Sequence, residues 1–151
     1  MVVSSTPPPV VAAFAPSGMY KNGGQVIPNA TWTKVTEWTA DTGTYPGSSI
    51  SSDGLDVQVG KAGAVITANI PWTTSGGGSP LSPVQCRIKV NGTVVVTGPD
   101  AGSGSSSGTQ TATITQTLLA TDNVTVEVYF GAFTQTSNNI VTGAGTYLRI
   151  T

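Results

Sequence analysis

The 151-residue sequence contains no histidine, and Cys86 is its only cysteine. Without histidine, the usual pairs of nucleophile and base for covalent catalysis cannot form. A zinc site would lack its common nitrogen and sulfur donors, and a single cysteine excludes a disulfide within the chain. Because Cys86 keeps the phase of the apolar positions in residues 84–90, we interpret it as a buried, unreactive thiol.

Charged side chains are also scarce, at 9% of residues against an average of about 25%. The formal net charge of −1 gives no electrostatic reason to bind nucleic acid or an anionic membrane. Most carboxylates fall in expected turns or on outward strand positions, where solvation accounts for them. They are Glu37, Asp41, Asp53, Asp56, Asp100, Asp122 and Glu127. We therefore expect no enzyme, no catalytic residue and no cofactor.

Asp53 and Asp56 are the pair that most resembles a metal site. Loop carbonyls beside them would suit Ca²⁺, but one spaced pair of carboxylates falls short of the roughly six to eight oxygens that Ca²⁺ takes. Asp53-Gly54 is also typical of a turn. We expect a turn here and no bound metal.

Long apolar runs are absent too. No stretch approaches the ~20 residues needed to span a bilayer, so we expect no membrane insertion. The first nine residues, MVVSSTPPP, lack the basic start and apolar segment of a secretion signal. The expectation is synthesis in a cytoplasm, with release only by cell lysis or through an assembly.

Residues 1–9 are predicted to form an extended N-terminal arm. Pro7, Pro8 and Pro9 favour polyproline geometry and contribute no backbone donors. The arm is either a frayed terminus or a tether that docks on a neighbouring subunit. In the second case Val2 and Val3 join the prolines in offering apolar contacts with little charge.

What the sequence does contain is alternation of apolar and polar residues. Gln110–Phe130 alternates in two halves around a connection at residues 119–123, and we predict an antiparallel hairpin there. Asn91-Gly92 between two alternating runs predicts a second hairpin. Further strands are expected at residues 10–15, 31–38, 55–59, 64–70 and 146–150. No stretch has the apolar period of a helix, so about eight to ten strands predict one all-β antiparallel domain, residues 10–151.

Four aromatic residues are candidates for contact with a glycan or with another protein. They are Trp32, Trp38, Tyr45 and Trp72. Aromatic rings stack on sugars, but they are enriched equally at protein interfaces. Trp32 and Trp38 share a parity in the predicted strand at residues 31–38, whose two mixed faces suit a sheet edge or a subunit contact.

The order of segments resembles the trimeric jelly-roll family that includes tumour necrosis factor and the globular heads of complement-type proteins. The resemblance rests on Ala12–Ala15, on "IKVNGTVVV" within residues 85–96, and on "TQTATITQTLLATDNVTVEVYF" at residues 109–130. It covers residues 10–151, with Thr146–Ile150 in place of the family's last strand. It implies a jelly-roll sandwich that assembles as a homotrimer.

A second resemblance is to small minor tail or decoration proteins of tailed phages that infect actinobacteria. It rests on residues 31–72 and on "IKVNGTVVVTG" at residues 88–98, in a chain of low charge rich in Thr and Gly. It implies a structural virion protein, tail-associated or decorating the capsid, whose N-terminal arm fixes a jelly roll to other virion proteins. The alternative is a receptor- or carbohydrate-binding module on the phage surface, reading a host glycan through loops 41–47, 73–83 and 98–108.

Overall fold

The computed structural model describes residues 1–132 and 137–151, and within them it contains thirteen β-strands and no helix. This part of the chain therefore includes no apolar helix of membrane-spanning length. The strands exceed the expected number because five of them are only two or three residues long. They are β1 (Ser17–Lys21), β2 (Gln25–Ile27), β3 (Thr33–Lys34), β4 (Trp38–Ala40), β5 (Ile50–Ser51), β6 (Gly54–Asp56), β7 (Lys61–Ser75), β8 (Leu81–Val90), β9 (Thr93–Thr97), β10 (Ser107–Leu118), β11 (Asn123–Gly131), β12 (Ser137–Ile140) and β13 (Gly143–Ile150).

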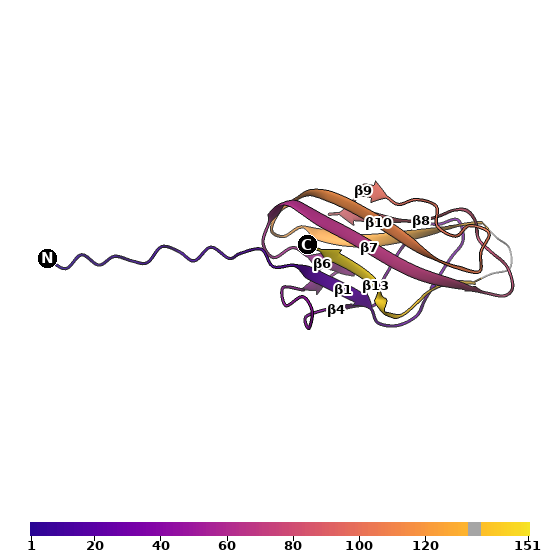
Figure 1. Cartoon of the computed structure of the whole chain (residues 1–151), viewed down its shortest axis with the longest axis horizontal. Coiled ribbons are helices and arrows are strands. Elements are labelled where there is room, and N and C mark those ends of the chain that lie inside the picture. The colour runs from indigo at the N-terminus through magenta and orange to yellow at the C-terminus, as the bar shows by residue number, and fades with distance from the viewer. Residues whose placement is uncertain (133–136) are drawn as a thin grey trace.

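The strands form two antiparallel sheets that face each other, with the N-terminal segment extending away from them (Figure 1). Sheet A has the order β2-β12-β7-β13-β1-β4, and β10 lies along the other edge of β7. Sheet B has the order β5-β6-β11-β8-β9, with β3 also paired to β11. This all-β sandwich confirms the fold class predicted from the alternation.

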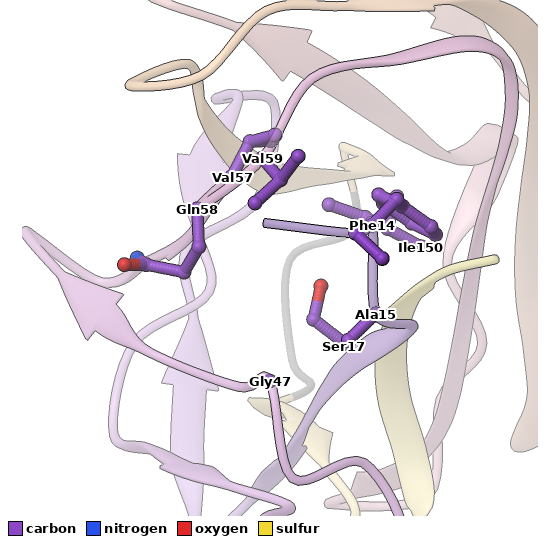
Figure 2. A pocket seen from close by; sticks show the side chains of 9 residues that line it. Phe14, Ala15, Ser17, Gly47, Val57, Gln58, Val59 and Ile150 are labelled. Atoms are coloured by element: carbon purple, nitrogen blue, oxygen red, sulfur yellow. The ribbon is translucent and has the colours of Figure 1, made fainter. Parts of the chain in front are cut away.

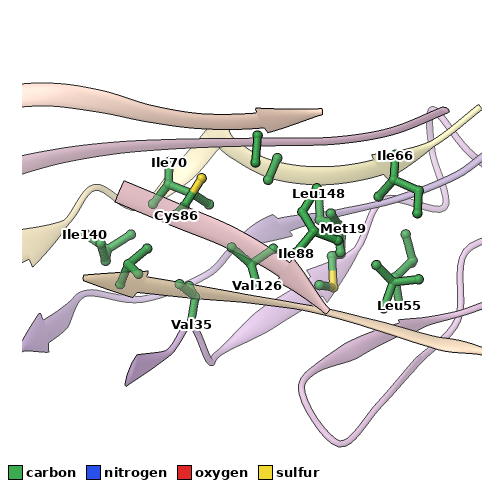
Figure 3. Close-up of a cluster of buried hydrophobic side chains, with 14 of the residues drawn as sticks. Met19, Val35, Leu55, Ile66, Ile70, Cys86, Ile88, Val126, Ile140 and Leu148 are labelled. Atoms are coloured by element: carbon green, nitrogen blue, oxygen red, sulfur yellow. The ribbon is translucent and has the colours of Figure 1, made fainter. Parts of the chain in front are cut away.

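The core is the layer of apolar side chains between the two sheets (Figure 3). The inward row of β7, which is Ala64, Ile66, Ala68 and Ile70, is fully buried, as the alternation predicts. Cys86 is buried among these side chains, and burial raises the pKa of its thiol from 9.0 to about 12. Because burying one large aliphatic side chain contributes about 1.5–3 kcal/mol, these rows dominate the stability of the sandwich.

The hairpin predicted at Gln110–Phe130 is wrong, although both of its strands exist. β10 pairs with β7 in sheet A, whereas β11 pairs with β8 in sheet B. The connection between them therefore crosses from one sheet to the other. Val57 fixes the crossing, because its N–H donates to the carbonyl of Asp122 and its carbonyl accepts from the N–H of Thr121, both at 2.8 Å. Alternation shows that a strand has one buried face, but it does not identify the strand that pairs with it.

The strand predicted at residues 10–15 is also wrong. Residues 1–16 form no strand, and β1 begins at Ser17. Val10 and Val11 are almost fully exposed and pair with no strand. The exposed arm thus continues beyond the predicted boundary at residue 9, as far as Ala13.

The predicted strand at residues 31–38 is divided between the sheets. β3 belongs to sheet B and β4 to sheet A, and Glu37 between them has a positive φ of 57°. Trp32 and Trp38 therefore do not share one strand face. The turn at Asn91-Gly92 is confirmed: it connects β8 to β9, and its φ values of 50° and 80° are those of a tight hairpin turn.

Candidate functional site

The N-terminal arm is the part of the chain that contacts the sandwich least. Residues 1–13 are exposed, and none of the described residues forms a hydrogen bond with residues 1–15. Figure 1 shows the arm extending away from one end of the sandwich. Phe14 is the first side chain to pack against the core, with the Lys61 Nζ 4.6 Å from its ring centroid. The arm thus leaves the domain at Phe14.

A cavity of about 110 Å³ lies where the arm meets the sandwich (Figure 2). Phe14, Val57, Val59 and Ile150 give it mostly apolar walls, and Ser17 lies at its side. No titratable side chain lines it, so the cavity offers no acid or base to activate the Ser17 hydroxyl. Its chemistry suits an apolar side chain rather than a reacting substrate.

The structure separates the four candidate aromatic residues. Trp72 is 1% exposed, edge-on to Phe130 at 5.2 Å between ring centroids, so it is not available to a ligand. Trp38 is half-buried, and its indole N–H donates to the Val35 carbonyl at 2.8 Å. Both residues serve the packing of the domain.

Tyr45 lies on the outer face of sheet A. The Arg149 guanidinium lies 5.6 Å from the Tyr45 ring centroid and 3.7 Å from that of Tyr147. The tyrosine ring also covers Gly18, where a Cβ would lie 2.7 Å from the Tyr45 ring. Tyr45 is therefore part of a layer of side chains on this sheet rather than a free loop residue.

Trp32 lies on the outer face of sheet B, in a cluster that the sequence interpretation missed. The Arg87 guanidinium lies 4.2 Å from the Trp32 ring centroid, and Tyr129 lies 5.3 Å from it. Arg87 contacts the Glu127 carboxylate at 2.5 Å, and Lys89 contacts its other oxygen at 2.9 Å. Parity alone places these side chains outward, but their proximity depends on the register of β8 with β11, which the sequence does not reveal.

The electrostatics of Glu127 reflect both burial and these two cations. Partial burial acts to raise the pKa of Glu127, but hydrogen bonds from Lys89 and Arg87 outweigh that effect and hold the pKa below its usual value. Glu127 is therefore ionised at neutral pH and is shared by the two cations. With two cations on one carboxylate, the cluster has a net positive charge.

The three candidate loops lie at opposite ends of the sandwich. Gly47 lines the cavity at the base of the arm, so loop 41–47 is at the arm end. β7 starts near that cavity, where Lys61 lies over the Phe14 ring, and runs to the other end of the sandwich (Figure 1), where loops 73–83 and 98–108 meet. There the Gly104 N–H donates to the Pro80 carbonyl at 2.8 Å.

Asp100 ties the two distal loops together. The Ser82 hydroxyl donates to its carboxylate at 2.5 Å, and the Val84 N–H donates at 3.0 Å. The hydrogen bond from Ser82 is the main reason that the pKa of Asp100 lies below its usual value. The predicted loop 73–83 is shorter than expected, because β7 and β8 extend into it and leave residues 76–80 between them.

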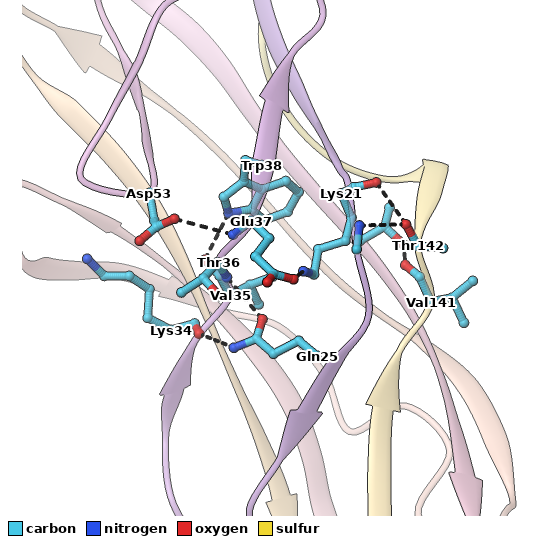
Figure 4. Close-up of polar contacts among 12 residues, drawn as sticks. Lys21, Gln25, Lys34, Val35, Thr36, Glu37, Trp38, Asp53, Val141 and Thr142 are labelled. Atoms are coloured by element: carbon cyan, nitrogen blue, oxygen red, sulfur yellow. Dashed lines mark hydrogen bonds and ion pairs between the residues drawn. The ribbon is translucent and has the colours of Figure 1, made fainter.

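A polar network near β1 and β2 has a structural role (Figure 4). Lys21 is fully buried, and its Nζ lies 3.4 Å from the exposed Glu37 carboxylate. The Gln25 side chain donates to the Lys34 carbonyl and accepts from the Thr36 N–H. These contacts hold the chain between β3 and β4 so that Val35 enters the core. Nothing in the described part of the chain groups three or more metal-ligating residues.

No protein-family model matches this sequence, and none of the curated proteins matches it. Solved structures do resemble the fold. Eiger TNF from S. frugiperda superposes with a TM-score of 0.64 at 8% identity, covering 91% of this chain and 90% of that one. Rabbit GITRL has a TM-score of 0.38 at 14% identity, covering 87% and 95% of the two chains. A family 35 carbohydrate-binding module from Clostridium thermocellum has a TM-score of 0.37 at 17% identity, covering 87% and 88%. The likeness to Eiger shows that this chain has a TNF-like jelly-roll fold.

Proposed function

We propose that the protein is a non-enzymatic structural component of a bacteriophage virion, a minor tail or capsid decoration protein attached through its N-terminal arm. The observation that carries the proposal is the arm itself. Val2 is 96% exposed and Val10 98% exposed, and no charged side chain precedes Lys21. An exposed apolar segment of this kind is typical of a surface that a partner covers.

The energetics of the arm favour attachment at several points. Burying Val2, Val3, Val10 and Val11 would return about 6–12 kcal/mol at about 1.5–3 kcal/mol each. The fixed φ of Pro7–Pro9 lowers the conformational entropy that the arm loses when it docks. Several linked arms would also gain from their high effective concentration.

A homotrimer would supply several arms, and the outer face of sheet A suits such assembly. One row across five paired strands carries only uncharged side chains there. The row is Thr39, Tyr20, Tyr147, Asn69 and Thr111. Tyrosine is enriched in interfaces, and charge is depleted at their centres. This uncharged row is accordingly our choice for the contact between copies, with the Arg149 guanidinium beside it, 3.7 Å from the Tyr147 ring centroid.

The alternative function is a receptor- or carbohydrate-binding module on the phage surface. The position of loops 73–83 and 98–108 favours it, because they meet at the end opposite the arm. A domain fixed by its arm would present those loops outward. Loop 41–47 lies at the arm end and does not join them.

Deletion of residues 1–9 tests the anchoring role. The truncated protein should keep its unfolding temperature, because those residues contact nothing in the described sandwich, but it should no longer join particles. A matched full-length variant with Ser4 and Ser5 changed to Ala should be incorporated normally. Incorporation of the truncated protein at the level of the full-length one would refute the anchor.

Light scattering at high protein concentration tests the trimer. The expected mass is three times that of one chain, and Tyr147→Lys should reduce it by placing charge in the uncharged row. A monomer at every concentration would contradict self-association in solution. For the alternative, an array of cell-wall glycans should show binding that depends on loops 73–83 and 98–108, and an array without signal counts against it.

A further inference from the structure

The outer face of sheet B holds an unusual concentration of charge for this protein. We define the basic–aromatic patch as Trp32, Arg87, Lys89, Glu127 and Tyr129. Three of its five members are charged, in a chain with only 9% charged residues. Strand pairing places Arg87 directly opposite Glu127, and the ring centroids of Trp32 and Tyr129 are 5.3 Å apart. The patch is therefore a built cluster rather than scattered surface residues.

Arg87 is held in position from two sides and still has donors to spare. Its Nε and Nη2 both contact one oxygen of Glu127, at 2.6 and 2.5 Å, and its guanidinium stacks on Trp32. A guanidinium has five N–H donors, and within the described residues Glu127 is its hydrogen-bonding partner. The side chain is 23% exposed. A fixed, partly exposed guanidinium with unused donors is well prepared to bind a carboxylate.

The remaining charges set the sign of the ligand. Glu127 is only 13% exposed, and each of its oxygens already contacts a cation. Lys89 uses one of its three donors on Glu127 and is 21% exposed. Lys34, on the neighbouring strand, points to the Ser52 carbonyl instead. One positive charge is therefore left uncompensated beside the rings, and it favours an anion.

The aromatic rings set the shape of the ligand. Trp32 and Tyr129 lie at 43° to each other on an open sheet face, and both remain partly exposed. The apolar face of a sugar ring packs well on such rings. The guanidinium lies 4.2 Å from the Trp32 centroid, so a sugar stacked on the exposed part of the rings would bring a carboxylate on that same sugar to Arg87.

From these contacts we propose that the basic–aromatic patch binds a carboxylated saccharide, with the sugar ring on Trp32 and Tyr129 and the carboxylate on Arg87 and Lys89. This inference rests on the glycan-binding form of the proposed function and moves that role from the distal loops to sheet B. An extended acidic peptide fits less well, because both edges of β11 are already paired. Nucleic acid is disfavoured by the net charge of −1.

Isothermal titration with tetragalacturonic acid tests the proposal, and its methyl ester is the matched neutral ligand. The full-length protein should bind the acid with a Kd of about 1 mM or tighter, and the ester about tenfold more weakly. Arg87→Gln and Trp32→Ala should each weaken binding of the acid about tenfold. Arg149→Gln is the control variant, because it removes the arginine of the tyrosine cluster on the opposite sheet and should bind as the unaltered protein does.

Several outcomes would overturn the proposal. The first is the absence of binding heat at about 10 mM tetragalacturonic acid. The second is a loss of affinity in Arg149→Gln as large as that in Arg87→Gln. The third is binding of poly-glutamate as tight as that of tetragalacturonic acid. If Trp32→Ala does not fold, Lys89→Gln replaces it, because the Lys89 side chain is partly exposed. Unchanged affinity for the acid in both Lys89→Gln and Arg87→Gln would refute the site. The protein lacking residues 1–9 should bind the saccharide normally, so failure of the anchor and failure of the patch are distinguishable.

Discussion

Replacing Gly98 with alanine should destabilise the domain, because the site leaves no room for a Cβ. Gly98 follows β9 at the edge of sheet B, and a Cβ there would overlap the carbonyl oxygen of Thr111 in sheet A and lie 2.9 Å from its carbonyl carbon. Both obstacles are backbone atoms of β10, so no side-chain rotation relieves the overlap. One of the two strands must move.

The magnitude follows from that movement. Overpacking of a filled site costs about 1–3 kcal/mol. Retreat of Gly98 would also weaken its N–H hydrogen bond to the Cys86 carbonyl, 2.8 Å long, which adds about 0.5–1.5 kcal/mol. We expect a loss of about 3 kcal/mol. For a chain of this size that lowers the unfolding temperature by about 6–12 °C.

Two further glycines provide matched controls for a thermal or denaturant unfolding assay. Gly145→Ala meets nothing within 4 Å and needs no positive φ, so its unfolding free energy should change by less than about 0.5 kcal/mol. Gly92→Ala also has open space, but its φ of 80° should cost about 1–2 kcal/mol. If Gly98→Ala is as stable as Gly145→Ala, the edges of the two sheets do not approach as described and the reasoning fails.

Three other predictions concern stability. Phe130→Ala should cost about 3–5 kcal/mol in urea unfolding, because its ring is fully buried, and a loss below about 1 kcal/mol would contradict that burial. The pKa of Cys86 rises from 9.0 to about 12 on folding, so the thiol ionises in the unfolded chain at a lower pH than in the folded one. The free energy of unfolding should therefore fall by about 1.4 kcal/mol per pH unit above pH 9 on account of Cys86. Cys86→Ala should remove that part of the pH dependence. The lowered pKa of Glu127 has the opposite sign, since its contribution is present at neutral pH and is lost as pH falls below the usual 4.5. Glu127→Gln should therefore reduce the loss of unfolding free energy that occurs as the pH falls below 4.5. If that loss is unchanged in the variant, the cations do not stabilise the carboxylate.

The features that were predictable from the sequence are local ones. Alternation in residues 64–70 identified the buried row of β7, and the same phase placed Cys86 in the core. Asn91-Gly92 specified its own turn, because both of its φ values are positive and few other residue pairs adopt them easily. Each of these depends on a few neighbouring residues.

The features that were not predictable depend on distant residues. The alternation of β10 and β11 is equally compatible with pairing to each other and with pairing to β7 and β8. Trp72 continues the inward row of β7, so its parity places it inside, whereas Trp32 lies just before the two-residue strand β3, where alternation gives no such sign. The basic–aromatic patch requires the register of β8, β11 and the segment before β3 at once, so its members look unrelated along the chain.

The position of β13 has a consequence for biosynthesis. This last strand lies between β7 and β1 in the middle of sheet A, paired on both sides. Until Ile150 has emerged from the ribosome, the edge of β1 that pairs with β13 has no partner. The edge of β7 at residues 66–69 is then unpaired as well. Sheet A therefore cannot close between β1 and β7 until residues 143–150 have been synthesised. A chain without β13 would leave β1 and β4 separated from the rest of sheet A instead of forming a shortened domain.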